Sequence, residues 1–410
     1  MNAVAEVVGQ LGGYRRLLGI RDYRLLWAAQ LVSTYGDRLS QLALAALVYG
    51  TTGSVMGLAL VLTISELPRA ALGLLAGAVA DRVSRKTLLI VADCARALIV
   101  LVLALWAGVP ILIVYCLAAL HATATVFFSP ARYAVLPDIV PREDLLNANT
   151  LDETTQDAFD PVAFLVGGAL VAIAGTRVAF GVDSLTFLLS AGLIAMTTTR
   201  SAALWRAQRD APRAVHVEAA EGVRVLFRDP VLRANTILML IACIVASSDT
   251  LLTYVMVFSH WERGAFGLGV FEALLAVGFV LGAFACGPVV AWLGKGDSII
   301  LGLVGTGFCM ALLAALPFWP AAFVNGVSGV FNILFFVPAI TLAQERAPCS
   351  SRARVISSRS ALLAVGIFAS YAMATALTTW IAPADLLTAM GAALTVLAAA
   401  AALVPTLRER

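Results

Sequence analysis

Long runs of apolar residues, separated by short polar or turn-forming stretches, follow one another along the whole of this 410-residue chain. A helix of about 20 apolar residues is long enough to cross a hydrocarbon core of roughly 30 Å. Helices also satisfy their own backbone hydrogen bonds where water is absent. The pattern predicts an all-α membrane protein with twelve transmembrane helices, at 24–50, 55–80, 87–107, 110–133, 150–174, 177–199, 234–258, 266–293, 298–317, 320–344, 357–381 and 384–405.

Composition supports this prediction. Hydrophobic residues make up 61% of the chain and charged residues 13%, whereas soluble domains are roughly 45–50% apolar. The six cysteines show no paired spacing, and five of them lie inside predicted spans. We therefore expect no disulfide framework and no metal site. The chain also lacks a nucleotide-binding loop and any recognisable catalytic or cofactor motif, so we expect neither an enzyme nor a bound cofactor.

Most of the 28 basic residues fall on one side of the predicted membrane. Arg177 and Arg263 lie on the other side, and Arg38, Arg69 and Arg96 lie within spans. Because Lys and Arg are enriched in cytoplasmic loops, both termini are predicted to be cytoplasmic. The net charge of +3 thus reflects topology, and we expect no nucleic-acid partner.

The chain divides into two halves that resemble each other. The longest hydrophilic stretch, 200–233, separates a predicted six-helix bundle at 1–199 from another at 234–410. Several landmarks recur at nearly constant spacing: Gly36 and Asp37 with Ser248 and Asp249, Gly77 with Gly287, Pro130 with Pro338, and Pro141 with Pro348. Internal repeats of this kind place substrate sites between the halves, which rock to give alternating access.

The hairpin at 77–86, Gly-Ala-Val-Ala-Asp-Arg-Val-Ser-Arg-Lys, resembles the signature between spans 2 and 3 of the major facilitator superfamily. Ser84 stands where that signature usually has glycine, and the second-half copy at 287–295 lacks the acidic residue. More narrowly, several motifs resemble the enterobactin-exporter and macrolide-efflux branch: 23–27, 33–38, 52–54, 129–133, 136–141, 145–149 and 183–187.

The resemblance implies a monomeric carrier in the bacterial inner membrane. Its partners would be the lipid bilayer, protons and a small-molecule substrate, and its function the proton-coupled export of amphipathic compounds such as drugs or siderophores. Two alternatives stay open: a carrier of lysolipids or other lipids with the same fold, and a membrane receptor on a carrier fold that transports nothing.

The resemblance also implies an inner gate at the hairpin. Asp81 would bond to the start of the span at 357–381 and to Arg132, and so hold the halves together on the cytoplasmic side. The gate would comprise Gly77, Asp81, Arg82, Arg85, Lys86 and Arg132. The alternative is an ordinary positive-inside loop, which explains the cations but not Asp81.

Asp37 is the first candidate for proton coupling. It lies roughly 20 Å along its span at about 1.5 Å per residue, where an uncompensated charge costs at least about 2.5–3.5 kcal/mol. A carboxyl group buried there can titrate near neutral pH. The resemblance implies that its counterpart Asp249 faces it across the substrate path. An ion pair with Arg38 is the alternative, although adjacent helical residues point about 100° apart.

Two further spans contain an acidic and a basic residue three positions apart, which places each pair on one helical face. Glu66 and Arg69 form the first pair; either they neutralise each other structurally, or Glu66 exchanges a proton while Arg69 balances its charge. We expect Asp93 and Arg96 to be a structural pair, because compensated pairs are the least costly way to keep charges in a membrane.

Five residues are predicted to line a substrate cavity: His121, Phe128, Asn325, Asn332 and Phe335. The alternatives are a neutral histidine bonded to a backbone carbonyl and asparagines that bond neighbouring helices. Other intramembrane acids receive simpler interpretations. We expect capping or water contact for Asp183 and Glu272, and stabilisation of a helix start for Asp152, Asp157 and Asp160.

Overall fold

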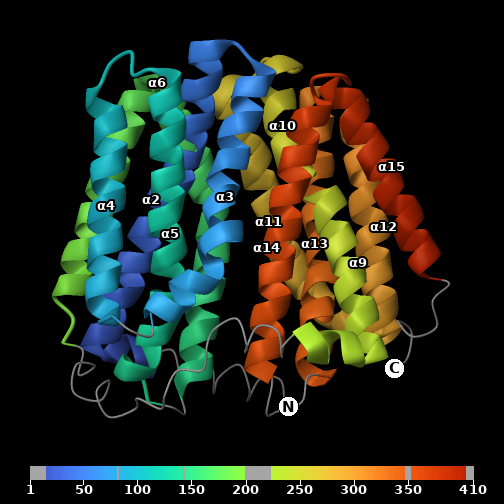
Figure 1. Ribbon diagram of the computed structural model, residues 1–410, viewed down its shortest axis with the longest axis horizontal. Coiled ribbons are helices and arrows are strands. Elements are labelled where there is room, and N and C mark those ends of the chain that lie inside the picture. Colours follow the sequence, from blue (N-terminus) through green and yellow to red (C-terminus); the bar gives the residue numbers. More distant parts are fainter. Residues whose placement is uncertain (1–14, 81–82, 142–143, 199–222, 347–351, 403–410) are drawn as a thin grey trace.

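The computed structural model describes residues 15–80, 83–141, 144–198, 223–346 and 352–402, and helices make up almost all of them (Figure 1). The first half contains α2 (Arg21–Thr52), α3 (Val55–Ala80), α4 (Arg85–Leu105), α5 (Ile111–Ile139) and α6 (Leu145–Ala195). The second half contains α9 (Pro230–Ala246), α10 (Ser248–Ser259), α11 (Gly264–Leu293), α12 (Lys295–Leu313), α13 (Phe318–Arg346), α14 (Arg352–Leu377) and α15 (Pro383–Ala401).

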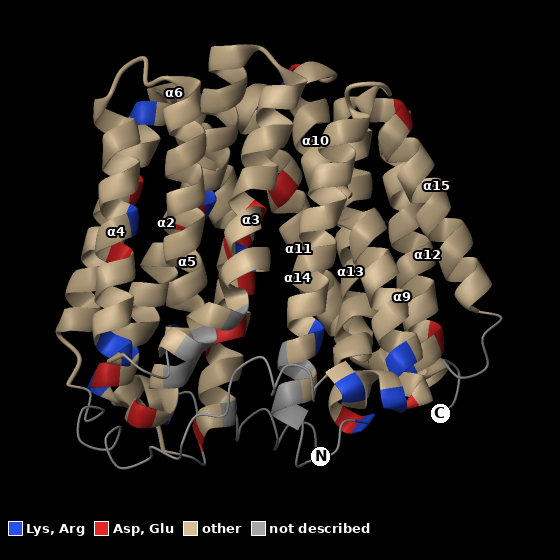
Figure 2. Cartoon of the chain, in the orientation of Figure 1, with Lys and Arg blue, Asp and Glu red and all other residues tan. Residues whose placement is uncertain are grey.

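Charged residues gather at one end of the helices (Figure 2). At this end, which we call the basic end, α2, α4 and α12 begin, with Arg21, Arg85 and Lys295 respectively. The other end, which we call the opposite end, is where α2 finishes and α3 begins. Cations at one end of an apolar bundle fit the sequence prediction that most loops on one side of the membrane are basic.

The longest helix, α6, spans the membrane twice. Its apolar part, Asn147–Ala195, has 49 residues and would measure about 73 Å if straight, more than twice the hydrocarbon thickness. The helix is interrupted at Gly175, where φ is 83° and ψ is 168°. Glycine accepts positive φ at little cost, so the chain turns back there. The predicted spans 150–174 and 177–199 are thus the two arms of α6.

The seventh predicted span consists of two helices. The segment Pro230–Ser259 is apolar over 30 residues, but Ser247 separates α9 from α10. The interruption places Asp249 in the first turn of α10, where a negative charge interacts favourably with the helix dipole.

Ten helical segments in the described ranges are long and apolar enough to cross a membrane, with both arms of α6 counted as one. The 32-residue α2, which carries several charges, is also long enough. The described helices are therefore consistent with the predicted twelve passes. The boundary between the halves stays a prediction, because 199–222 lie outside the described residues.

The halves meet at a pair of glycines on α6 and α11. A Cβ atom on Gly168 would lie 2.9 Å from the Cα of Gly269, and one on Gly269 would lie 2.6 Å from the carbonyl oxygen of Phe164. Small residues allow this close approach of two membrane helices. Gly168 is seven residues before the turn at Gly175, so the contact belongs to the side of the opposite end.

Hydrogen bonds join the halves on the same side. The Gln41 side chain on α2 donates to the Tyr254 hydroxyl on α10 at 2.7 Å. The hydroxyl oxygens of Thr63 on α3 and Thr375 on α14 are 2.9 Å apart. Thr63 lies near the start of α3 and Thr375 near the end of α14, and both of these helix ends are at the opposite end of the molecule. The structure therefore closes the interface there.

Candidate functional site

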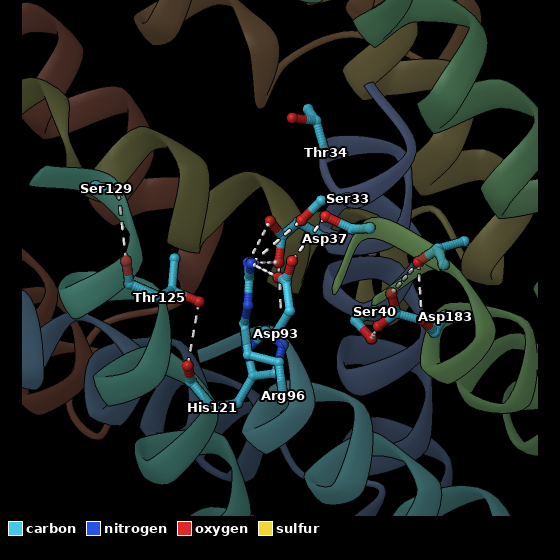
Figure 3. A network of polar contacts seen from close by, with 12 residues as sticks. Ser33, Thr34, Asp37, Ser40, Asp93, Arg96, His121, Thr125, Ser129 and Asp183 are labelled. Atoms are coloured by element: carbon cyan, nitrogen blue, oxygen red, sulfur yellow. Dashed lines mark hydrogen bonds and ion pairs between the residues drawn. The ribbon is translucent and has the colours of Figure 1, made fainter. Parts of the chain in front are cut away.

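A buried arginine connects two acidic residues in the first half (Figure 3). Nη1 of Arg96 on α4 lies 3.1 Å from Oδ2 of Asp37 on α2. Nη2 of the same guanidinium bonds to Asp93, one helical turn earlier on α4, and to the Ser33 hydroxyl at 3.2 Å. Arg96 and Asp93 are both fully buried, whereas the Asp37 side chain is 31% exposed. Asp37 is therefore the most exposed charged group of this network.

Aromatic rings hold the Arg96 guanidinium in place. Its central carbon lies 4.2 Å from the ring centre of Phe128 on α5 and 4.4 Å from that of Phe187 on α6. Cations are attracted to aromatic faces, and more strongly where water is excluded. The Ser190 hydroxyl on α6 donates to the second oxygen of Asp93 at 2.7 Å. Four helices thus fix one cation.

The predicted pair of Asp93 and Arg96 is present, but Arg96 also reaches Asp37. The alternative partner for Asp37, Arg38, points elsewhere: it forms two hydrogen bonds with Asp160 on α6, at 3.0 and 2.6 Å. The structure therefore agrees with the expectation that Asp37 and Arg38, as adjacent helical residues, point too far apart to pair.

A cavity of about 180 Å³ lies between Asp37 and the basic end. Its walls come from α2, α4, α5 and α6 and are mostly polar: Gln30, Ser33, Thr34, Asp37, Arg38, Arg96, Thr125, Phe128, Ser129, Arg132 and Gln156. Of the five predicted cavity residues, Phe128 lines it. His121 lies just beyond Asp37, with Nε2 3.9 Å from Oδ1 of that residue.

Gln156 on the first arm of α6 completes the cavity wall, and acidic side chains of the same arm bind cations that line it. Arg132 bonds to Asp152 and to Gln156, the latter at 3.1 Å, and Gln156 also accepts from Thr34 at 3.2 Å. The sequence predicts that Asp152 and Asp160 stabilise a helix start. That expectation is wrong because α6 begins at Leu145, so both lie inside the helix and face cations on α5 and α2.

Asp183 on the second arm of α6 is a site residue that the sequence interpretation missed. It is fully buried, and its carboxyl group bonds to Ser40 on α2 and, at 3.1 Å, to Thr186. The expectation of capping or water contact near a helix end is therefore wrong. Glu272 on α11 is also buried, at 7% exposure, so water contact does not explain it either.

The pair of Glu66 and Arg69 on α3 is present, with a nitrogen to oxygen distance of 3.3 Å. Glu66 is 18% and Arg69 58% exposed. Asp249 on α10 is partly buried and accepts a long hydrogen bond of 3.4 Å from Thr253. Both acids are thus embedded between helices, and their part in proton coupling stays a prediction.

The predicted cavity residues on α13 are largely occupied by helix packing. Asn325 is 2% exposed and donates to the Phe271 carbonyl on α11 at 3.0 Å, which favours the alternative that it bonds neighbouring helices. Phe335 is 6% exposed and packs into the hydrophobic cluster of the second half. Asn332 is partly buried.

The predicted gate is described only in part, since Asp81 and Arg82 lie outside the described residues, and Gly77 is described only as a backbone position on α3. Arg85 pairs with Asp138 at 3.0 Å, and Lys86 donates to the carbonyls of Ala195 and Thr197 at 2.7 and 2.5 Å. These contacts pin α4 to α5 and α6. Arg132 is already bonded within the first half, as described above.

Ser84, which replaces the usual glycine of the signature, is the N-cap of α4 and accepts a hydrogen bond of 3.5 Å from the Thr87 amide. Over the described ranges, no group of three or more His, Cys, Asp or Glu side chains could hold a metal ion. The polar groups of the cavity can instead exchange protons and bind polar parts of a small molecule.

Comparisons with known proteins agree with this architecture. The family model described as "Major Facilitator Superfamily" matches residues 26–371. The multidrug efflux pump Tap of Mycolicibacterium fortuitum is 26% identical over 356 residues, which cover 81% of this chain and 83% of the pump. The enterobactin exporter EntS of Salmonella typhi is 24% identical over 286 residues, with coverage of 68% and 66%.

Macrolide efflux protein A of Streptococcus pyogenes is 28% identical over 151 residues, which are 36% of each protein, so this match spans about a third of that relative. Among solved structures, a POT family transporter in complex with 5-aminolevulinic acid aligns with a TM-score of 0.77 at 9% identity, covering 95% of this chain and 97% of the other. The nucleoside transporter NupG aligns with a TM-score of 0.70 at 12% identity, with coverage of 92% and 99%.

Proposed function

Since this chain belongs to the major facilitator superfamily, and is thus a multi-pass membrane transporter, we propose that it exports amphipathic small molecules, such as drugs or siderophores, in exchange for protons. The efflux pumps and the siderophore exporter among its relatives support the export direction. They also support a place in the bacterial inner membrane. The cations at the basic end support an orientation of that end toward the cytoplasm.

One observation carries the proposal of proton coupling: a partly exposed carboxylate, Asp37, shares the buried cation Arg96 with Asp93. When Asp37 is ionised, the ion pair holds Arg96 between α2 and α4. Protonation of Asp37 cancels its attraction for Arg96 and leaves Asp93 as the paired carboxylate. One proton therefore changes both the charge of the cavity wall and the bond between two helices.

This arrangement links the proton to the substrate. A bound molecule in the cavity would contact Asp37, Thr34 and Gln156, which lie along its wall. A substrate with a cationic or hydrogen-bonding group would bind best to ionised Asp37 and would be released when Asp37 takes up a proton. Such differential binding is what allows one ligand to shift an equilibrium for another.

Alternating access requires a second state, and the interface supports one. The halves are joined at the opposite end by the glycines of α6 and α11 and by the Gln41 and Thr63 bonds, while the cavity lies toward the basic end. These positions support a state in which the carrier is open at the basic end, the end that we propose faces the cytoplasm. Asp81 and the other gate residues would act in the other state, and Glu66 and Asp249 are the further proton-coupling candidates.

A thermal-shift screen of the purified protein tests the substrate class. Drugs, siderophores and lysolipids would be added at two pH values, and a ligand that binds the native state raises the unfolding temperature. We expect drugs or siderophores to stabilise the protein, and more so at the higher pH, because the proposed exchange makes protons compete with the substrate. Stabilisation by lysolipids alone would favour the lipid carrier. Ligand binding without any transport in proteoliposomes would favour the receptor.

A further inference from the structure

Within the described part of the chain, the carboxyl group of Asp183 has hydroxyl partners and no cation. Ser40 on α2 and Thr186 on α6 are hydrogen bonded to it, and the Thr186 hydroxyl also lies 2.7 Å from the backbone carbonyl oxygen of Asp183. Among the described residues, no arginine, lysine or histidine lies within 4.0 Å of its carboxyl oxygens. Asp183 is fully buried. An ionised carboxylate that is removed from water and unpaired is very costly, so such a group binds a proton instead.

The neighbouring backbone leaves no room for water or a counter-ion on the α2 side. A Cβ atom on Gly36 would lie 2.1 Å from Oδ1 of Asp183 and 2.1 Å from Oγ1 of Thr186. Only glycine fits at position 36, and its lack of a side chain lets α2 pack directly on the carboxyl group of Asp183. Ser184, the next residue along α6, donates to the Ala97 carbonyl on α4 at 3.0 Å, which fixes the rotation of α6 around its axis.

A count of charges leads to the same assignment. The charged groups of the polar network beside Asp183 are Asp37 on α2 and Asp93 and Arg96 on α4; His121 on α5 lies on the far side of that network, next to Asp37 (Figure 3). Three carboxyl groups thus share one arginine. Asp93 and Asp37 are both bonded to that arginine, so the carboxyl group that stays neutral is Asp183.

Ser40 lies between Asp183 and the turn of α2 that carries Asp37. It lies three residues after Asp37, hence on the same face of α2 and one turn away, and it is bonded to Asp183 at its other side. A hydroxyl group can accept a proton on its oxygen while it gives up its own proton. The proton that leaves Asp183 would bind to the Ser40 oxygen, while the proton that Ser40 already carries would leave toward Asp37.

We propose that Asp183 is a second proton-binding site of this carrier, which is loaded in the state described here and exchanges its proton with the cavity through Ser40. The coupling role of this site rests on the proposed function, whereas its occupancy by a proton does not. With Asp37, it would give the network two exchangeable protons.

Infrared spectroscopy of the purified protein at neutral pH tests the occupancy. A protonated carboxylic acid has a C=O stretching band that a carboxylate lacks. We expect Asp183→Asn to lose one such band, and Asp138→Asn, whose carboxylate is paired with Arg85, to keep it. An unchanged acid band in Asp183→Asn would overturn the proposal.

Ser40→Ala provides a second variant that leaves Asp183 in place. Its acid band should remain but shift, because the hydrogen bond to Ser40 is gone. After transfer into D₂O, exchange at Asp183 should be about tenfold slower than in the wild type, equivalent to about 1.4 kcal/mol in the barrier. Exchange at the wild-type rate, with an unshifted band, would show that Ser40 does not serve this site.

Two measurements distinguish a failure of the proton site at Asp183 from a failure of proton-coupled transport. If the wild type shows the Asp183 band but transports no protons in proteoliposomes, the proton site stands and proton coupling fails. If proton-coupled transport is present but the Asp183 band is absent, coupling stands and the second site fails. Where both are present, fewer protons should move per substrate in Asp183→Asn than in the wild type; an equal number would contradict its role in coupling.

Discussion

Arg96 reaches Asp37 at 3.1 Å across the space between α4 and α2, while its other terminal nitrogen bonds to Asp93. The two carboxylates differ in their surroundings, since Asp93 is fully buried and Asp37 is 31% exposed. The buried bond therefore anchors the arginine, and the exposed one can respond to protons and ligands.

Removal of Arg96 should destabilise the protein strongly. In Arg96→Gln, Asp93 becomes a buried carboxylate without a cation, a change that typically costs about 3–5 kcal/mol. The double variant Arg96→Gln with Asp93→Asn removes the stranded charge and should recover much of the loss. Thermal unfolding in detergent measures both. A single variant as stable as the wild type would contradict the assigned role of the pair.

Gly36→Ala should reduce stability, because the new methyl group would overlap Asp183 and Thr186. Overpacking of this kind typically costs about 1–3 kcal/mol. Gly181→Ala is the matched control, since a Cβ atom there meets nothing within 4 Å. Chemical denaturation of both variants checks the prediction. Equal stability of the two would mean that α2 and α6 are further apart than described.

A disulfide between the halves should stop transport reversibly. The Thr63 and Thr375 hydroxyl oxygens are 2.9 Å apart, so cysteines at both positions come close enough to pair. In Thr63→Cys with Thr375→Cys, oxidation should hold the opposite end closed, and a reductant should restore transport. Each single variant serves as a control. Transport by the cross-linked protein at the wild-type rate would exclude alternating access through this interface.

The sequence predicts the architecture well because the bilayer imposes one simple requirement, a run of about 20 apolar residues in each span. It also draws attention to Asp37, Asp93 and Arg96, since a charge inside an apolar run is conspicuous. The break at Ser247 inside the seventh predicted span is less visible, because turn residues mark a bend without fixing its geometry.

The sequence could not predict which residue each intramembrane charge pairs with, because these ion pairs depend on contacts between spans. The sequence places Arg38 beside Asp37, yet helix rotation directs Arg38 to Asp160 and brings Arg96, 59 positions away, to Asp37. The burial and bonding of Asp183 could not be predicted for the same reason. Its depth along the span was visible, but its contact with Gly36 and Ser40 exists only once α2 and α6 pack together.

The cavity does not lie between the two halves, where the internal repeat predicts a substrate site. The two halves share landmarks, and these drew attention to Asp249 as the counterpart of Asp37. The cavity nevertheless is lined by the first half, where the polar side chains of α2 and α6 face each other. Chain symmetry therefore located the interface but not the polar groups along it.

The central claim is that Asp37 couples the proton to transport, and proteoliposomes containing Asp37→Asn test it most directly. Substrate efflux and proton movement would be followed together under an imposed pH gradient, with a ligand from the thermal-shift screen as substrate. We predict that Asp37→Asn folds and binds the ligand but shows no proton-driven flux. Proton-driven flux at the wild-type rate in Asp37→Asn would show that Asp37 does not couple the proton to transport.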